Sequence, residues 1–164
     1  MGASQAELES LYRDRYLSFR RALANVTGSY EVAHDVTQEA FARALSQSRR
    51  YRGDAPLGAW VWGIALRVAR EERMRRHHLP LEDAFEGRLV DPGHDEGLAN
   101  ALRALPPRRR LVFFLRYFAD MSYREIAIVC GISEGTVAAT VAQARSALVE
   151  ALAETQPVAE EVAT

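Results

Sequence analysis

The stretch from residue 105 to 145 carries side chains whose order could bind a nucleic acid duplex. Ser122 is followed three residues later by Glu125, a capping box that begins a helix. Gly131 can give that helix its left-handed end, and Ser133 can cap the next one. This spacing predicts a helix-turn-helix, in which the second helix enters the major groove while the first crosses the backbone.

The polar side chains of this segment are its candidate DNA contacts. Direct readout of a base edge needs arginine, lysine, asparagine or glutamine, and Gln143 is the one well-placed amide. The candidate contacts are Arg124, Ser133, Glu134, Thr136, Thr140, Gln143 and Arg145.

The elements that must position these residues are helices, because apolar residues recur at steps of three and four along most of the chain. The pattern predicts helices over 5–26, 31–47 and 57–77, and then over 98–105, 107–119, 123–130 and 134–154. In the second helix we expect Phe41 and Leu45 to face inward, and in the third we expect Trp60 in the core. The fold class is therefore all-α.

Charge and composition divide the chain into two small helical domains. The periodicity fails over residues 79–97, where proline and glycine accompany one arginine and six acidic residues, so we expect a flexible acidic linker. Domains of residues 1–78 and 98–155 flank it, and 156–164 form a polar, disordered tail. The net charge of −1 conceals a basic first domain, with 13 arginines against nine acids.

Several function classes lack their sequence signals. A single cysteine excludes an internal disulfide, and the four histidines are too scattered for a metal site. The sequence has no phosphate loop and no nucleophile with a matching base, so we expect no enzyme, cofactor or small-molecule substrate. With no signal peptide and no apolar run near the roughly 20 residues that span a bilayer, we expect a cytoplasmic location away from membranes.

Two motifs in one order carry a family resemblance. The first is Asp35-Val36-Thr37-Gln38-Glu39-Ala40-Phe41, and the second is Leu105-Pro106-Pro107-Arg108 leading into the helix-turn-helix. Together they resemble the extracytoplasmic-function (ECF) class of bacterial sigma factors over about residues 8–153, although LuxR-type regulators share a similar helix-turn-helix. The resemblance implies a transcription-initiation subunit with core RNA polymerase, promoter DNA and an anti-sigma factor as partners.

The resemblance also implies roles for the first domain and the linker. The residues that match the helix docking on the clamp coiled coil of the polymerase are Asp35, Gln38, Glu39, Phe41 and Arg43. A solvated acidic helix face is the alternative, but it does not explain their order. The acidic linker matches a sigma-factor segment that threads toward the catalytic cleft of the polymerase, where its acidic residues mimic RNA. An ordinary solvated tether between the two domains explains the composition of the linker equally well.

A third set matches the part of the family that opens DNA and grips the downstream promoter element. Aromatic faces stack on unpaired bases for about 1–3 kcal/mol each, and arginines hold the backbone. We expect Trp62, rather than the buried Trp60, to supply the aromatic contact. The set is Arg49, Arg50, Tyr51, Arg52, Trp62, Arg67 and Arg70, and the alternative for its basic end is a solvated helix terminus.

The sequence departs from the family at both DNA-reading ends. Ala138, Ala139, Thr140 and Gln143 stand where mostly basic residues are usual, and Gly63, Leu66 and Arg67 replace arginine, arginine and asparagine. A rival function is therefore a divergent sigma-like interaction protein that docks on polymerase or an anti-sigma partner without reading promoters alone. A stand-alone helix-turn-helix repressor leaves the first domain unexplained.

Overall fold

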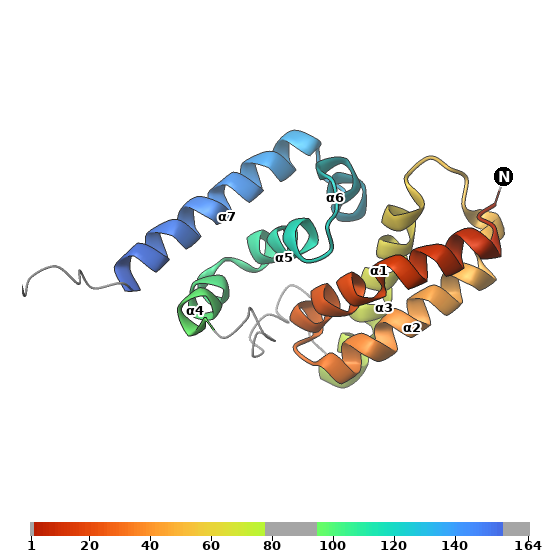
Figure 1. Cartoon of the computed structure of the whole chain (residues 1–164), viewed down its shortest axis with the longest axis horizontal. Helices are drawn as coiled ribbons and strands as arrows, with labels where there is room; N and C mark the ends of the chain where they lie inside the picture. The colour runs from red at the N-terminus through yellow and green to blue at the C-terminus, as the bar shows by residue number, and fades with distance from the viewer. Residues whose placement is uncertain (1, 78–94, 156–164) are drawn as a thin grey trace, which may run out of the picture.

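The computed structural model describes residues 2–77 and 95–155, and it has no strand among them. The first helical region holds α1 (Gln5–Thr27), α2 (Tyr30–Ser46), the short 3-10 helix η1 (Ser48–Arg50) and α3 (Leu57–His77). The second helical region holds α4 (Glu96–Ala104), α5 (Pro107–Tyr117), α6 (Tyr123–Cys130) and α7 (Glu134–Thr155), as Figure 1 shows. The expected all-α class is confirmed. Residues 79–94 of the expected linker and the expected tail at 156–164 lie outside the described residues.

Local capping groups set the helix ends. Gly28 ends α1 with a left-handed φ of 74°, and Gly131 ends α6 in the same way with φ 65°. Asp95 caps α4 by accepting a hydrogen bond from the Leu98 amide at 3.0 Å. The helix therefore begins at Glu96 rather than at Leu98, because a residue assigned to the acidic linker acts as its N-cap.

An aromatic cluster fills the core of the first helical region. The rings of Phe19 and Trp62 stack at a centroid distance of 4.1 Å, and Phe41 meets Phe19 edge-on at 5.2 Å. Trp62 is only 2% exposed. Its neighbours on the inner face of α3, Ala65, Leu66 and Ala69, are buried as well, so α3 is covered over a broad arc.

A buried arginine fixes the corner between α4 and α5. The Nη2 atom of Arg110 donates hydrogen bonds to the carbonyl oxygens of Arg103, at 2.6 Å, and Leu105, at 3.0 Å. Both carbonyls lie at the C-terminal end of α4, where backbone acceptors lack partners within the helix. Burial, followed by the nearby charge of Arg103, lowers the pKa of Arg110.

The two helical regions also touch each other. Helix α1 contacts α5, and α3 contacts α6. The buried apolar side chains of both regions belong to one connected cluster. The helix-turn-helix therefore lies against the first helical region in this structure, as the ribbon in Figure 1 shows.

Gly63 offers a test of the α3 packing. A Cβ atom at this helical position would meet no atom within 4 Å, so alanine adds helix propensity without a clash. We expect Gly63→Ala to raise the free energy of unfolding by about 0.5–1 kcal/mol, measured by thermal melting. Gly2→Ala is the matched contrast, because its Cβ would lie 2.7 Å from the Ser48 carbonyl oxygen and must lower stability. A lower melting temperature for Gly63→Ala would contradict the open space beside α3.

Candidate functional site

The polar residues of the first motif lie on the outer face of α2. Asp35, Gln38 and Glu39 are exposed. Phe41, three residues after Gln38, is buried at 8% exposure, with its ring edge-on to Tyr12 at 5.0 Å. The motif thus combines an exposed polar face with one aromatic anchor in the core.

Arg43, the remaining residue of that set, is paired within the chain. Its Nε atom lies 2.6 Å from Glu39 Oε1, and its Nη1 atom lies 2.7 Å from Glu71 Oε2. The hydrogen bond to Glu39, followed by that to Glu71, raises the pKa of Arg43. This arrangement connects the polar face of α2 to α3. The sequence analysis missed Glu71, because no local pattern relates residues 28 positions apart.

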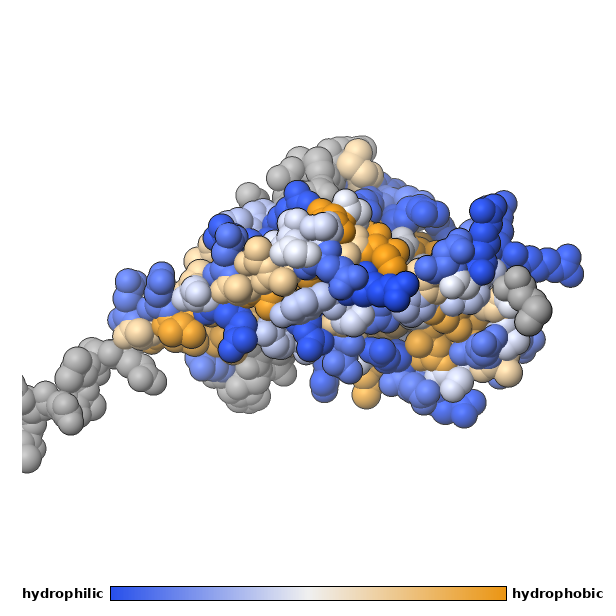
Figure 2. Space-filling model, turned by 90° about the horizontal axis from the view of Figure 1, so that it is seen from above, coloured by the Kyte–Doolittle hydropathy of each residue, from blue (hydrophilic) through white to orange (hydrophobic). Residues whose placement is uncertain are grey.

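A second side-chain network joins α2 to α1. The Tyr16 hydroxyl lies 2.5 Å from His34 Nδ1, and His34 Nε2 lies 3.3 Å from the amide nitrogen of Gln38. Beside it runs a mainly apolar groove, in which Gln5, Glu9 and Arg13 accompany the apolar and aromatic lining residues Leu8, Tyr12, Tyr16, Phe41, Ala42 and Leu45. The expectation that Leu45 faces inward is wrong, because it is 46% exposed at the rim of this groove. Figure 2 shows hydrophobic areas among hydrophilic side chains on the part formed by α1–α3.

The connection between α2 and α3 gathers three exposed arginines, Arg49, Arg50 and Arg52. Tyr51, between them, is half-buried and donates a hydrogen bond from its hydroxyl to the Ala55 carbonyl at 2.7 Å. Its ring lies 5.4 Å from that of Trp60. An aromatic pair therefore lies at the base of a basic loop.

Trp62 is more buried than Trp60, contrary to expectation. The expectation that Trp62 is exposed for stacking on a base is wrong, because Trp62 is buried against Phe19. Trp60 is half-buried and shares a helix face with the exposed Arg67 and Arg70, at spacings of seven and ten residues. That spacing was the sequence signal that could have placed Trp60 beside these two arginines.

The helix-turn-helix forms as expected. The capping box between Ser122 and Glu125 is present, and α6 and α7 meet at a bend of 105°, a normal angle for this motif. Arg124 is exposed on α6. The exposed candidates on α7 are Ser133, Glu134, Thr136, Gln143 and Arg145, and Thr140 is half-buried.

Three hydroxyl groups of α7 are occupied within the helix. Ser133 Oγ accepts from the Thr136 amide at 3.0 Å, and the two hydroxyls lie 2.8 Å apart. Thr140 Oγ1 donates to the Thr136 carbonyl at 2.7 Å. Local bonds of this kind use part of the hydrogen-bonding capacity of the three hydroxyls. Gln143 is the one side-chain amide among the candidate DNA contacts.

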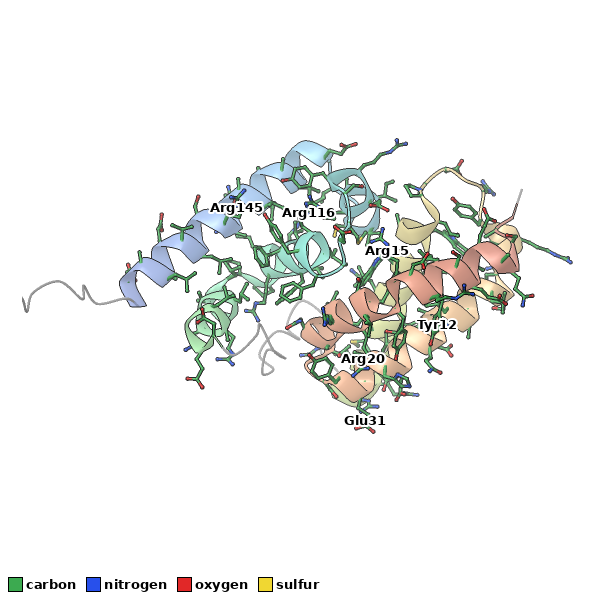
Figure 3. All side chains as sticks on the ribbon, viewed as in Figure 1. Tyr12, Arg15, Arg20, Glu31, Arg116 and Arg145 are labelled. Atoms are coloured by element: carbon green, nitrogen blue, oxygen red, sulfur yellow. The ribbon has the colours of Figure 1, made fainter. Side chains whose placement is uncertain are left out.

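Helical geometry separates the two strongest DNA-binding candidates of α7. Thr136, Thr140 and Gln143 share one face at steps of four and three residues. Arg145 follows Gln143 by two residues, which places it nearly on the opposite side of the helix. Figure 3 labels Arg145 on α7. The structure therefore does not bring these two side chains together.

Within residues 2–77 and 95–155, no group of three or more histidine, cysteine, aspartate or glutamate residues is placed so that it could hold a metal ion. No single helix in the described part of the chain is long and apolar enough to span a membrane. Helices α6 and α7 meet that length and hydropathy only when they are taken together, and the bend between them is 105°.

Two family models match the two helical regions. The model for sigma-70 region 2 matches residues 11–78, which include most of α1 and all of α2 and α3. The model for sigma-70 region 4 matches residues 95–148, which include α4 to α6 and most of α7. Among curated proteins, RNA polymerase sigma-H factor of Pseudomonas aeruginosa is 30% identical over 140 residues, covering 73% of this chain and 72% of that protein. The chain belongs to the sigma-70 family, in its ECF class.

Further relatives of this sigma factor agree with that assignment. RNA polymerase sigma factor YlaC of Bacillus subtilis is 27% identical, covering 84% of this chain and 87% of that protein. ECF RNA polymerase sigma factor EcfG of Rhodopseudomonas palustris is 29% identical, covering 80% and 77%.

Two solved structures share the fold of this sigma factor. CnrH, in complex with the cytosolic domain of CnrY, matches with a TM-score of 0.69 and 24% identity, covering 94% of this chain and 92% of that chain. RpoE from Bartonella quintana, in complex with the anti-sigma factor NepR, matches with a TM-score of 0.68 and 19% identity, covering 92% and 99%.

Proposed function

We propose that this ECF sigma factor binds core RNA polymerase through the outer face of α2 and directs it to promoters. The observation that carries the proposal is the division of the α2 motif, with Asp35, Gln38 and Glu39 exposed and Phe41 anchored in the core. In this proposal residues 1–78 dock on core polymerase and melt the promoter DNA. Residues 79–97 link the two domains, and residues 98–155 read the upstream promoter element. The chain catalyses no reaction itself, and its polymerase partner implies a cytoplasmic location.

An anti-sigma factor is the second proposed protein partner. Support comes from the relatives of known structure, because RpoE was solved with the anti-sigma factor NepR and CnrH with the cytosolic domain of CnrY. The apolar groove between α1 and α2 opens beside the polar face of α2, so one partner could cover both surfaces.

Strand opening is assigned to the basic loop and the outer face of α3. Tyr51 and Trp60 offer ring surface for an unpaired base, and the arginines around them hold the phosphates. Captured bases and polymerase contacts supply the free energy of melting. Arg67 and Arg70 extend the basic surface along α3.

The proposal is tested by transcription with purified components. Core polymerase, genomic fragments and the sigma factor should give transcripts from discrete start points that are absent when the sigma factor is omitted. Binding to core without any start point would favour the interaction protein, which the small exposed residues Ala139 and Ala142 on α7 also suit.

Two α7 variants separate base readout from general attraction to DNA. Gln143→Ala should weaken binding to the upstream element by about 1–3 kcal/mol and relax its sequence preference. Arg145 lies nearly opposite Gln143 on α7, so Arg145→Ala should weaken binding to all sequences equally and less, through lost long-range attraction to the phosphates. Both are measured by titrating holoenzyme with labelled duplexes at several salt concentrations. Equal losses on specific and random DNA for Gln143→Ala would contradict its readout role.

A further inference from the structure

Gly2 and Ala3, which we call the N-terminal strap, lie against the connection between α2 and α3. Ala3 is 8% exposed, and its amide donates a hydrogen bond to the Ser48 carbonyl oxygen at 3.0 Å. Ser4 follows the strap and begins α1 through a capping box with Glu7. Figure 1 shows the start of α1 beside the end of α2. The strap therefore joins the beginning of α1 to η1.

The strap can lie this close only because its first residue has no side chain. A Cβ atom at Gly2 would be 2.7 Å from the Ser48 carbonyl oxygen and 2.8 Å from Arg49 Cα. Both are backbone atoms, which cannot turn aside as the end of a flexible side chain can. Glycine is the residue that allows such a close approach of two backbones. Any other residue at this position must displace the strap or η1.

The Ser48 carbonyl connects the strap to an aromatic residue of the basic loop. The Tyr51 amide donates to the same oxygen at 3.2 Å, so one acceptor receives the bond from the strap and the bond that closes η1. The Tyr51 ring lies 5.4 Å from the Trp60 ring. A continuous series of contacts thus runs from the strap to the aromatic pair.

The short helix η1 has few contacts of its own to fix its position. It is three residues long, and its N-cap residue, Gln47, makes no side-chain capping bond. Hydrogen bonds in 3-10 helices have poorer geometry than those in α-helices. Arg49, Arg50 and Arg52 are exposed in and after η1, and their like charges repel one another. Contacts from outside η1 therefore matter for its position, and the strap supplies them.

We propose that the N-terminal strap is a positioning element for strand opening, which holds η1 so that Tyr51 and the loop arginines meet the unpaired strand in a preformed arrangement. The inference rests on the proposed function of the basic loop. Without the strap, the loop would have to be ordered while a base is captured. Fixing even one backbone residue at that step lowers the rate by about 5- to 30-fold.

The test uses the full chain with two strap variants and two controls. Gly2→Ala places a Cβ against the backbone of η1, and Ala3→Pro removes the amide that donates to Ser48. Ala6→Val adds methyl groups at an exposed position of the first turn of α1, away from these contacts. Val26→Ala lowers overall stability from the far end of α1, where Val26 is fully buried.

Three measurements separate positioning from stability. Hydrogen exchange of the free chain reports the order of residues 47–55, fluorescence of a base analogue reports the rate of strand opening by the holoenzyme, and a titration reports affinity for core polymerase. We expect both strap variants to exchange faster over 47–55 and to open DNA at least about 5-fold more slowly, with unchanged affinity for core. The two control variants should match wild type in all three measurements.

Three results would overturn the proposal. Unchanged exchange in both strap variants would mean that the strap does not hold the loop. Faster exchange with undiminished strand opening would mean that the order of the loop is irrelevant to opening. An equal loss of opening in Val26→Ala would assign the effect to overall stability.

Failure of the proposed function gives a different pattern. In that case no chain, wild type included, opens promoter DNA, and the role in strand opening falls with it. The exchange measurement needs no polymerase, so it still shows whether the strap holds η1 in place.

Discussion

Replacement of Trp62 by alanine should cost the first helical region about 3–5 kcal/mol, the usual range for deleting a buried tryptophan. Trp62 is 2% exposed and stacks on Phe19 at 4.1 Å, so its removal leaves a cavity and breaks the aromatic cluster. Small domains have a total stability of only about 5–15 kcal/mol. We therefore expect a fall in melting temperature on the order of 20 °C, measured by circular dichroism.

Trp60→Ala is the matched control on the same helix. Trp60 is half-buried against Tyr51, so its loss should cost roughly 1–2 kcal/mol, in proportion to the smaller buried area. It should instead reduce strand opening, measured by fluorescence of a base analogue placed in the melted region. If Trp62→Ala remained stable and lost strand opening while Trp60→Ala kept it, the roles assigned to the two residues would be wrong.

The tryptophan assignment shows where sequence reasoning fails for this fold. A single apolar stripe on α3 puts Trp60 in the core and Trp62 outside, because it assumes that one face of the helix is covered. Helix α3 instead packs against α1 and α2 on one side and α6 on another, so its buried arc is broad. Leu45 fails for the opposite reason, since α2 leaves it at the edge of a groove.

Local signals, by contrast, predicted the helix ends well. The bounds of α3 and α6 match the expected 57–77 and 123–130. For α6 the reason is local, because Ser122, Glu125 and Gly131 act through atoms a few residues away. Contacts between distant segments had no such signal. The pair of Arg43 with Glu71 and the bond from Arg15 to Ala119 follow only from the packing of helices.

The expected roles of the α7 hydroxyls illustrate an intermediate case. A threonine inside a helix commonly returns its hydroxyl to the carbonyl four residues earlier, as Thr140 does to Thr136. The sequence thus held the information that Thr140 is a poor candidate for base readout. All the candidate DNA contacts of the helix-turn-helix, Gln143 and Arg145 among them, stay predictions until DNA binding is measured.

Reversing both acidic charges on the outer face of α2 should have the largest effect on function. We expect the Asp35→Lys, Glu39→Lys double variant to bind core polymerase at least about 100-fold more weakly, because breaking a charge pair across an interface costs about 2–5 kcal/mol. Folding should change little, since both residues are exposed and the pair of Glu39 with Arg43 is a surface ion pair worth at most about 1 kcal/mol. A fluorescence titration with core polymerase measures the affinity, and thermal melting measures the fold.

The Glu150→Lys, Glu154→Lys double variant is the matched control. It makes the same change in net charge at two exposed positions on α7, away from the α2 motif. If both double variants lost affinity equally, long-range attraction by the net charge of the chain would explain the effect. If only the α2 variant loses affinity while keeping its melting temperature, the polar face of α2 is the docking surface, because the two variants differ only in where the charge lies.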